Sequence, residues 1–271
     1  MIILDSFNAI MKDVEGAGNV ARGESTYDYR RVYHSTNEDL VKLFNNVKLK
    51  DKDVFSVLSS GDQVFTCFYK GAKSVDSFDI NKLTIYYYYL RKWMITKKHS
   101  EYIKDWYLES NRDLIKLIMT VDPVIEDEKN AQIFWLNYIN SNNGLDKNIF
   151  LPTSERYKNV FSDDIDGLSK RIKNIKFYNY DISSSFILKK KYDVVVLSNV
   201  LECLVHPAQL FRAKSNVSRL LKSGGICLCS HIMEDKDSNI HEKEIEIMTS
   251  GDLEYIDDYN KHDVGYVYKK K

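Results

Sequence analysis

Two residues, Gly61 and Asp79, have the types and the spacing of a nucleoside-binding site. Gly61 lies in a tight turn, Ser59-Ser60-Gly61-Asp62-Gln63, that follows an apolar run. A glycine there lets the backbone approach a ligand, and the helix amides that follow can face an acceptor group. Asp79 comes 18 residues later, near the spacing at which an acid binds ribose hydroxyls, and apolar Ile80 can lie against an adenine. The alternatives are a packing role for Gly61 and a helix N-cap role for Asp79.

Two further polar positions follow apolar runs in the same way. In Tyr180-Asp181-Ile182 a carboxylate can accept from the adenine amino group, although a loop cap explains Asp181 equally well. Ser198 and Asn199 end the clearest strand pattern of the chain, a run that is apolar on both faces, and they need hydrogen-bond partners, which a ligand can supply. Because the carboxyl ends of parallel strands meet at one edge of a sheet, these residues predict a single crevice together with Gly61 and Asp79.

Several other nucleotide and hydrolase sites are disfavoured by missing motifs. The chain has no Walker A pattern, no three-glycine dinucleotide fingerprint and no G-x-S-x-G elbow. The crevice is therefore expected to bind a nucleoside with no pyrophosphate.

The elements that must position these residues alternate between short apolar strands and helices. The expected strands are Val54–Leu58, Ser74–Phe78, Ile175–Tyr178, Val194–Leu197 and Ile226–Cys229. This alternation is typical of a parallel sheet in an α/β fold. A helix is expected to begin at His206-Pro207 and to end at Gly224-Gly225, with Lys222 in its last turn beside the negative end of the helix dipole.

A helical insertion is expected after the second strand, at about residues 87–174. Apolar residues recur there at helical spacing, and further helices are predicted over 102–120 and 127–139. The four tyrosines 86–89 point in four directions on a helix, so some are expected in the core and the rest in solvent.

Composition excludes several classes of protein. The 271 residues carry 39 basic and 39 acidic side chains, so the formal net charge of zero gives no electrostatic footprint for nucleic acid. No run is long enough to span a membrane and the start lacks a signal peptide pattern, which favours a cytoplasmic protein. The four cysteines and six histidines lack ligand spacing, so buried free thiols are expected and no metal site.

The chain resembles the class I S-adenosyl-L-methionine (SAM)-dependent transferases in the segments that the crevice uses. These segments are Val54–Gly61, Ser77–Asn81, Asn179–Ile182, Tyr192–Glu202 and Leu220–Gly225. A narrower likeness to the BtaA-like family rests on Ser60–Gln63, Gly71–Val75, Phe78–Asn81, Leu197–Val200 and the upstream Ser35–Glu38. That family includes an enzyme that moves a 3-amino-3-carboxypropyl group from SAM to diacylglycerol.

The resemblance implies a Rossmann-like sheet with helices on both faces, SAM as cofactor, and transfer of a 3-amino-3-carboxypropyl or methyl group to a small molecule or, less favoured, a lipid. Residues 51–271 would form the SAM-binding domain, and residues 1–50 a helical segment that covers the cofactor. The implied cofactor-binding residues are Tyr33, Thr36, Ser59, Ser60, Gly61, Asp62, Gln63, Asp79, Ile80, Asn81, Asp181, Ile182, Ser198 and Asn199.

The residue that assists the reaction is left open. A hydroxyl acceptor would need a general base, for which Glu202, His206 and a tyrosine of the insertion are candidates. The glycine motif is reduced to Gly61, so the alternative function is a non-catalytic module that binds SAM or another nucleoside. An RNA methyltransferase is disfavoured by the neutral charge.

Overall fold

A computed structural model describes most of the chain. The described residues are 12, 19–22, 25–28, 31–97, 111–142, 149–151, 160–185, 188–204, 206–230, 238–258 and 265–271.

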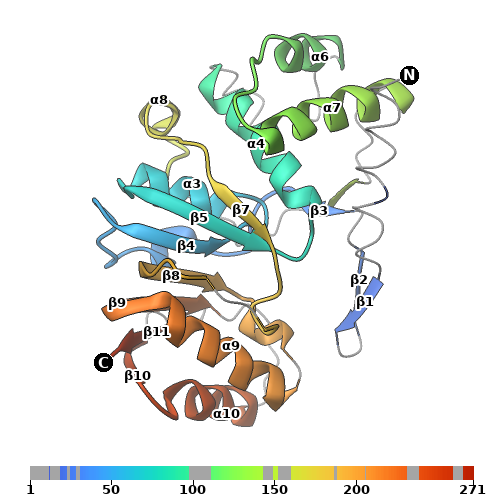
Figure 1. The fold of residues 1–271 in the computed structure, drawn as a ribbon. Coiled ribbons are helices and arrows are strands. Elements are labelled where there is room, and N and C mark those ends of the chain that lie inside the picture. Colours follow the sequence, from blue (N-terminus) through green and yellow to red (C-terminus); the bar gives the residue numbers. More distant parts are fainter. Residues whose placement is uncertain are drawn as a thin grey trace.

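A seven-stranded sheet, ordered β10-β11-β9-β8-β4-β5-β7, forms the centre of the molecule (Figure 1). Its strands are β4 (Asp53–Val57), β5 (Ser74–Asp79), β7 (Lys176–Asn179), β8 (Tyr192–Ser198), β9 (Leu221–Ser230), β10 (Leu253–Asp258) and β11 (Gly265–Lys270). The five strands from β7 to β9 are parallel, and β11 runs antiparallel to both β9 and β10. All five strands expected from the sequence are present, and the Rossmann-like fold class is confirmed.

Helices cover both faces of this sheet (Figure 1). On one face α3 (Asp62–Tyr69), α4 (Leu83–Thr96) and α8 (Ile165–Ser169) share a core with inward residues such as Val54 and Val194. On the other face α9 (Pro207–Leu220) and α10 (Ser238–Thr249) share a core with Phe55 and Val195. Successive residues of a strand point to opposite faces, which is why adjacent β4 and β8 residues belong to different cores.

The end of α9 differs from the expectation. The helix begins after His206 as predicted, but it ends at Leu220 and the chain enters β9 directly. The glycines 224 and 225 lie inside β9, where the pairing with β8 shifts register between Tyr192 and Val194 and Gly224 has a φ of 73°. The prediction that Lys222 lies in the last turn of the helix is therefore wrong. Lys222 lies on β9 and binds carboxylates of the neighbouring strands.

The region after β5 contains α4, α6 (Asn111–Met119), α7 (Glu126–Ser141) and the short strand β6 (Phe150–Leu151). The first part of the helix expected over 102–120 lies outside the described residues. Here α4 packs against α6, α7, α8 and β3 (Val32–Tyr33).

The tyrosines of α4 are all buried, so the expectation that some face solvent is wrong. Tyr86 stacks on Phe134 of α7 at 5.3 Å between ring centroids, and Tyr88 stacks on Phe65 of α3 at 5.1 Å. The Tyr87 hydroxyl donates to the His34 carbonyl at 2.7 Å. Consecutive residues of a helix point in different directions, and here each of these directions faces another part of the protein. All four tyrosines are therefore buried, because α4 is surrounded by other elements.

The described part of residues 1–50 contains the hairpin of β1 (Asn19–Arg22) and β2 (Ser25–Asp28), strand β3 and the one-turn helix α2 (Leu40–Leu43). Strand β3 pairs in parallel with β6, which ties this segment to the region after β5. The division into a covering segment of 1–50, a SAM-binding domain of 51–271 and an insertion at about 87–174 stays a prediction.

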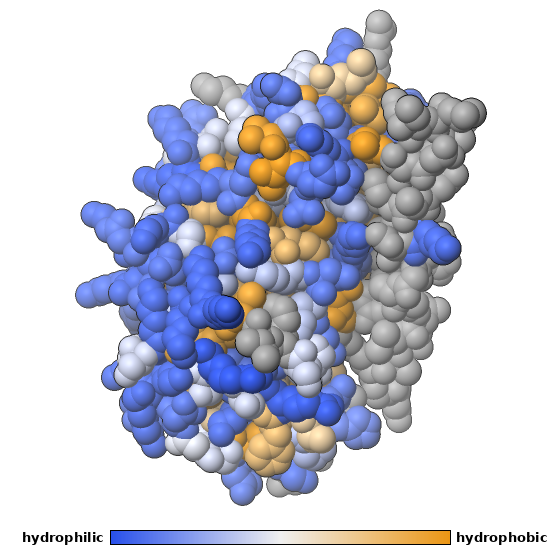
Figure 2. All heavy atoms as spheres, in the orientation of Figure 1, coloured by the Kyte–Doolittle hydropathy of each residue, from blue (hydrophilic) through white to orange (hydrophobic). Residues whose placement is uncertain are grey.

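The surface seen in Figure 2 is largely hydrophilic, and its apolar residues show in separate groups. The exposed large apolar side chains are spread over several segments, with two of the six on β10: Val41, Met119, Val124, Phe211, Tyr255 and Ile256. None of the described helices combines the length and the hydropathy that crossing a bilayer requires.

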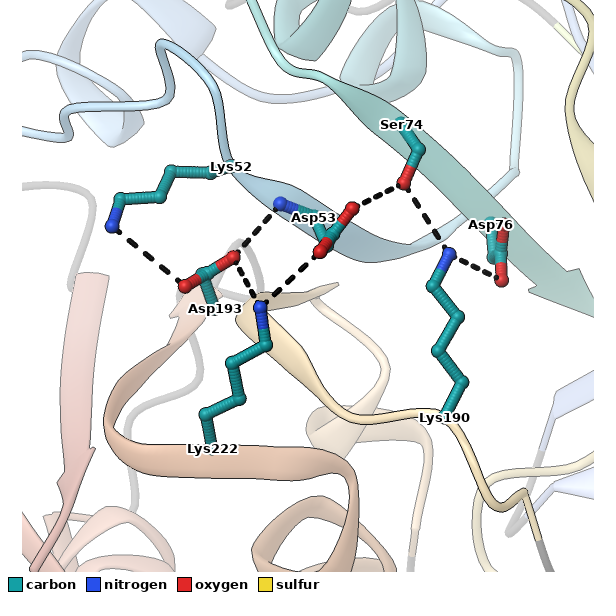
Figure 3. A network of polar contacts seen from close by, with 7 residues as sticks. All are labelled: Lys52, Asp53, Ser74, Asp76, Lys190, Asp193 and Lys222. Atoms are coloured by element: carbon teal, nitrogen blue, oxygen red, sulfur yellow. Dashed lines mark hydrogen bonds and ion pairs between the residues drawn. The ribbon is translucent and has the colours of Figure 1, made fainter.

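Paired charges connect the amino ends of the parallel strands (Figure 3). The Lys222 ammonium lies 2.9 Å from Asp193 and 3.2 Å from Asp53, and the Asp53 amide donates to Asp193 at 2.9 Å. A second pair joins Lys190 to Asp76 at 3.1 Å. The Ser74 hydroxyl, which donates to Asp53 at 2.8 Å, joins the two pairs.

These contacts shift the ionisation of the network. The hydrogen bonds from Ser74 and Lys222 lower the pKa of Asp53. Burial acts to raise the pKa of Asp193, but the hydrogen bonds from Lys222 and the Asp53 amide outweigh it, so the pKa of Asp193 is also lowered. Both aspartates raise the pKa of Lys222. The network therefore stabilises the fold above the ordinary carboxylate pKa of about 4 and below the ordinary lysine pKa of about 10.

We predict that Lys222→Met lowers the thermal unfolding midpoint by about 2 to 4 °C at pH 7, the effect of losing about 1 kcal/mol in a chain of this size. The difference between the unfolding midpoints of the variant and the unmodified protein should become smaller as the pH falls through the depressed aspartate pKa values, because the partners of Lys222 then lose their charge. Lys189→Met, at an exposed lysine, is the control and should leave the midpoint unchanged. A Lys222 effect of equal size at pH 7 and at acid pH would contradict an ionic origin.

Candidate functional site

The direction of chain growth reverses between β4 and β8. From β4 the chain adds β5 and then β7 on one side, and it returns to place β8 and β9 on the other. In open parallel sheets a ligand crevice forms at such a reversal, outside the carboxyl ends of the strands. Ser59, just beyond β4, and Ser198, the last residue of β8, flank this point.

Backbone strain is concentrated at the same place. In the described part of the chain, three residues other than glycine have positive φ: Asp51, Ser59 and Ser198. The φ values are 49° for Ser59 and 56° for Ser198, in a region that costs an L-residue roughly 1 to 3 kcal/mol and that occurs preferentially at binding and catalytic sites. Two of the three strained residues thus lie at the reversal point.

The Asp79 carboxylate is held at this edge by two backbone amides. One oxygen accepts from the Ser59 amide at 2.8 Å and the other from the Asn81 amide at 2.9 Å. The Asp79 side chain is partly exposed. A carboxylate oriented in this way can accept from vicinal hydroxyls of a ligand.

The predicted site residues divide into a rim and a buried layer. The partly exposed rim consists of Tyr33, Ser59, Asp79, Ile80, Asp181 and Asn199. The buried layer consists of Thr36, Ser60, Gly61, Asp62, Gln63, Asn81, Ile182 and Ser198. The structure brings the residues that follow β4, β5 and β8 together, and those that follow β7 lie at the same edge of the sheet.

Several members of the two layers make contacts within the protein. The Asn81 side chain donates to the Arg31 carbonyl at 2.7 Å and accepts from the Leu83 amide at 3.0 Å, which places it at the start of α4. Asp181 accepts from the Ser183 amide at 2.7 Å, as a loop cap does. The Ile182 carbonyl accepts from Asn216 at 2.6 Å.

Gly61 is required by the conformation of its backbone. Its φ of 93° is in the left-handed region, where glycine is favoured. A Cβ at this position would also lie 3.2 Å from the Phe65 ring and 3.4 Å from the Tyr88 ring. The missing side chain therefore serves aromatic packing, and the Gly61 amide itself donates to the Leu58 carbonyl at 2.7 Å, which closes the turn.

Asp62 and Arg91 form a fully enclosed ion pair at the start of α3. The Arg91 Nη2 lies 2.8 Å from the Asp62 carboxylate, and Arg91 Nη1 donates to the Ser60 carbonyl at 2.8 Å. The other Asp62 oxygen accepts from the Ser60 hydroxyl at 2.7 Å and from the Thr36 amide at 2.9 Å. Burial acts to raise the pKa of Asp62, but the charge and hydrogen bond of Arg91 outweigh it and lower that pKa.

A second buried carboxyl, Glu38, lies where β8 and β9 end. It accepts from Gln63 Nε2 at 2.7 Å and from the Thr36 hydroxyl at 3.2 Å. The hydroxyls of Ser198 and Ser230 also donate to it. Burial raises the pKa of Glu38, its hydrogen bonds act to lower it, and the nearby charge of Glu202 acts to raise it; the net direction is upward.

Sequence reasoning missed Glu38 and Ser230 as site residues. Glu38 appeared only within a segment of family likeness, and Ser230 within no motif. Their contacts span 160 residues to Ser198 and 192 residues to Ser230, so no local spacing signals them. The one available signal was a charged residue two positions after Thr36, which was already expected in the site.

The cysteines and the metal-binding chemistry give no competing centre. Cys227 and Cys229 point to the same side of β9, with their sulfurs 3.7 Å apart, and are buried free thiols like Cys67. The described residues contain no group of three or more histidine, cysteine or acidic side chains arranged to hold a metal ion.

We predict that Arg91→Met destabilises the protein by about 3 to 5 kcal/mol, because it leaves the Asp62 charge buried without a partner. Urea-induced unfolding followed by circular dichroism measures this loss. The double variant Arg91→Met/Asp62→Asn should lose less than Arg91→Met alone, since it removes the uncompensated charge. Equal losses in the two would show that packing of the Arg91 stem, rather than charge pairing, stabilises this part of the fold.

No protein-family model and no curated protein sequence matches this chain. Similar solved structures include the N-methyltransferase NodS from Bradyrhizobium japonicum in complex with S-adenosylhomocysteine (11% identity, 85% of this chain and 83% of that one, TM-score 0.43). Another is a TehB-like SAM-dependent methyltransferase from Corynebacterium glutamicum (10% identity, 99% of each chain, TM-score 0.46). A third is the magnesium protoporphyrin IX methyltransferase from Synechocystis with bound SAM (10% identity, 84% and 74%, TM-score 0.43). At these TM-scores the strand order of the sheet itself, rather than the likeness, defines the fold.

Proposed function

We propose that this protein binds SAM at the carboxyl edge of the sheet and transfers a group from it to a small-molecule acceptor. The observation that carries the proposal is the Asp79 carboxylate, partly exposed and fixed by the Ser59 and Asn81 amides beside the reversal point. An acid at the end of the second strand of such a sheet is suited to a ribose.

The residues around Asp79 fit the rest of this cofactor. Ile80 and Asp181 on the rim are suited to an adenine. Ile80 can make apolar contact with the ring, and the Asp181 carboxylate can accept a hydrogen bond from the amino group of the adenine. On the other side of β4, the buried side-chain oxygen Oε1 of Gln63 has no hydrogen-bond partner. A buried acceptor of this kind costs free energy unless a donor reaches it, and the amino-acid end of SAM carries such a donor.

The bound cofactor supplies a sulfonium whose neighbouring carbons are electrophilic, so the protein itself needs little covalent chemistry. Its residues must orient the acceptor and exclude water. The segment that contains Thr36 and Glu38 is suited to exclude water, because both residues are buried against the strand ends. Glu202, half-buried after β8, exposed His206 and a tyrosine of the insertion remain the candidates for a base toward a hydroxyl acceptor.

The group transferred is methyl or 3-amino-3-carboxypropyl, and the likeness to the BtaA-like family, which stays a prediction, favours the latter. Attack of the acceptor at the methyl carbon leaves S-adenosylhomocysteine, whereas attack at the γ-carbon of the methionine chain leaves methylthioadenosine. Product identification by mass spectrometry after incubation with candidate acceptors separates the two reactions.

The alternative function is a module that binds SAM or another nucleoside without turnover. It is favoured by the geometry of Gly61, whose missing side chain is accounted for by the Phe65 and Tyr88 rings. Cofactor binding without either product on any acceptor would support this alternative.

We predict that the protein binds SAM with a micromolar Kd and that Asp79→Ala weakens binding about tenfold or more, because hydrogen bonds to a charged group are lost. Isothermal titration calorimetry measures both values. Asp193→Asn removes a carboxylate at the opposite edge of the sheet and is the matched control, expected to bind SAM as the unmodified protein does. Absence of SAM binding in the folded, unmodified protein would contradict the proposed function.

A further inference from the structure

Glu38 is a buried carboxyl whose hydrogen-bond partners are all neutral. It is 4% exposed, and its donors are one amide and three hydroxyls, from Gln63, Thr36, Ser198 and Ser230. Within the part of the chain that the structure describes, no lysine, arginine or histidine pairs with it. Buried carboxylates normally have a cationic partner, because an unpaired charge in the interior is costly.

Asp62 and Glu128, two further buried acids, follow that rule. Asp62 pairs with Arg91 at 2.8 Å, and Glu128 pairs with Lys92 at 3.0 Å. Glu38 is surrounded equally well by donors, but none of them is charged. What distinguishes Glu38 from these two acids is therefore the absence of a cationic partner, and not a lack of hydrogen bonds.

A second observation at the same place also points to a donor from outside the chain. Gln63 is fully buried, and its amide nitrogen is directed at Glu38, at Thr36 and at Ser198. Its amide oxygen, on the same carbon, has no partner. A side chain that contacts the Glu38 carboxyl therefore has an acceptor without a donor, while the carboxyl itself has donors but no cation.

We infer that Glu38 and Gln63 bind a primary ammonium group, which donates to the Glu38 carboxylate and to Gln63 Oε1. An ammonium has the positive charge that Glu38 lacks and three N–H donors, enough for both side chains. Neutral donors such as hydroxyls would leave the carboxylate without a counter-charge.

The place of the cluster in the sheet names two sources for the ammonium. Ser198 and Ser230 end β8 and β9, on the far side of the reversal point from Asp79. On the proposed function, on which this part of the inference rests, the amino-acid end of SAM or an amine acceptor extends to that side. The chemistry is the same for both, and experiment distinguishes them.

The cofactor source is tested by calorimetry with S-adenosylhomocysteine and its des-amino analogue, in which hydrogen replaces the α-amino group. If the cofactor supplies the ammonium, the unmodified protein binds S-adenosylhomocysteine about tenfold or more tightly than the analogue. Glu38→Gln should bring this ratio close to one without weakening the analogue, and Glu38→Asp, which keeps the charge, should retain part of it.

The acceptor source is tested with n-butylammonium chloride against n-butanol on the protein without cofactor. If an amine acceptor supplies the ammonium, the ratio of the affinities for S-adenosylhomocysteine and its des-amino analogue is the same in all variants. In that case the unmodified protein binds butylammonium in preference to butanol, and Glu38→Gln loses that preference.

Glu128→Gln is the matched control, since it makes the same change at a buried glutamate that has Lys92 as partner. It should leave both preferences unchanged. Thermal melting establishes that each variant is folded. If Glu38→Gln fails to fold, Gln63→Met, which removes the orphaned oxygen and leaves the carboxyl, should reduce the same preference about threefold or more.

Ligand preferences that are the same in the folded Glu38 and Gln63 variants as in the unmodified protein would overturn the inference. Failure of the proposed function looks different. In that case neither S-adenosylhomocysteine nor its analogue binds the unmodified protein, and the butylammonium preference, present or absent, still decides whether Glu38 and Gln63 form an ammonium site.

Discussion

The enclosed ion pair of Asp62 and Arg91 is the constraint on which the rest of the carboxyl edge depends. A carboxylate at the start of α3 without exposure to water must be neutralised, and the arginine that neutralises it comes from α4, across the turn that contains Gly61. The same carboxylate accepts the Thr36 amide from the segment before the sheet. One buried charge thus fixes three segments that lie far apart in the sequence, and it sets the position of the turn between β4 and α3.

The two edges of the parallel sheet treat charge in opposite ways. At the amino edge, Asp53, Asp76 and Asp193 all have lysine partners, and the contacts are partly exposed to solvent. At the carboxyl edge, Glu38 is buried among neutral donors, and Ser59 and Ser198 have strained backbone conformations. The charges at the first edge are paired, whereas the buried carboxyl and the two strained residues at the second edge violate local rules of stability. Such violations are expected where a protein retains groups for a ligand at a cost in stability.

The sequence was sufficient to predict the parallel sheet, for a physical reason. Strands buried on both faces are near-continuous apolar runs, so runs such as Val194–Leu197 are recognisable without knowledge of their neighbours. The rim position of Asp79 was predictable for the same reason, because a polar residue directly after such a run must lie at the sheet edge. What local patterns lacked was information about the surroundings of each element. The enclosure of α4 by α3 and α7, which buries all four tyrosines, is a property of the assembled fold, and so is the continuation of the chain from α9 into β9 at Lys222.

Thr36 links the Asp62–Arg91 ion pair to Glu38 and Gln63. The segment before the sheet therefore does more than cover the strand ends. The Thr36 amide donates to Asp62, while its hydroxyl donates to Glu38 and accepts from Gln63 Nε2 at 3.0 Å. The position of the Glu38 carboxyl is therefore determined through one residue by the Asp62–Arg91 pair. A ligand that supplies a positive charge to Glu38 would give this buried carboxyl the cationic partner that it lacks among the described residues. Binding of that ligand and packing of the segment against the strand ends are then coupled by direct contacts, so each should stabilise the other.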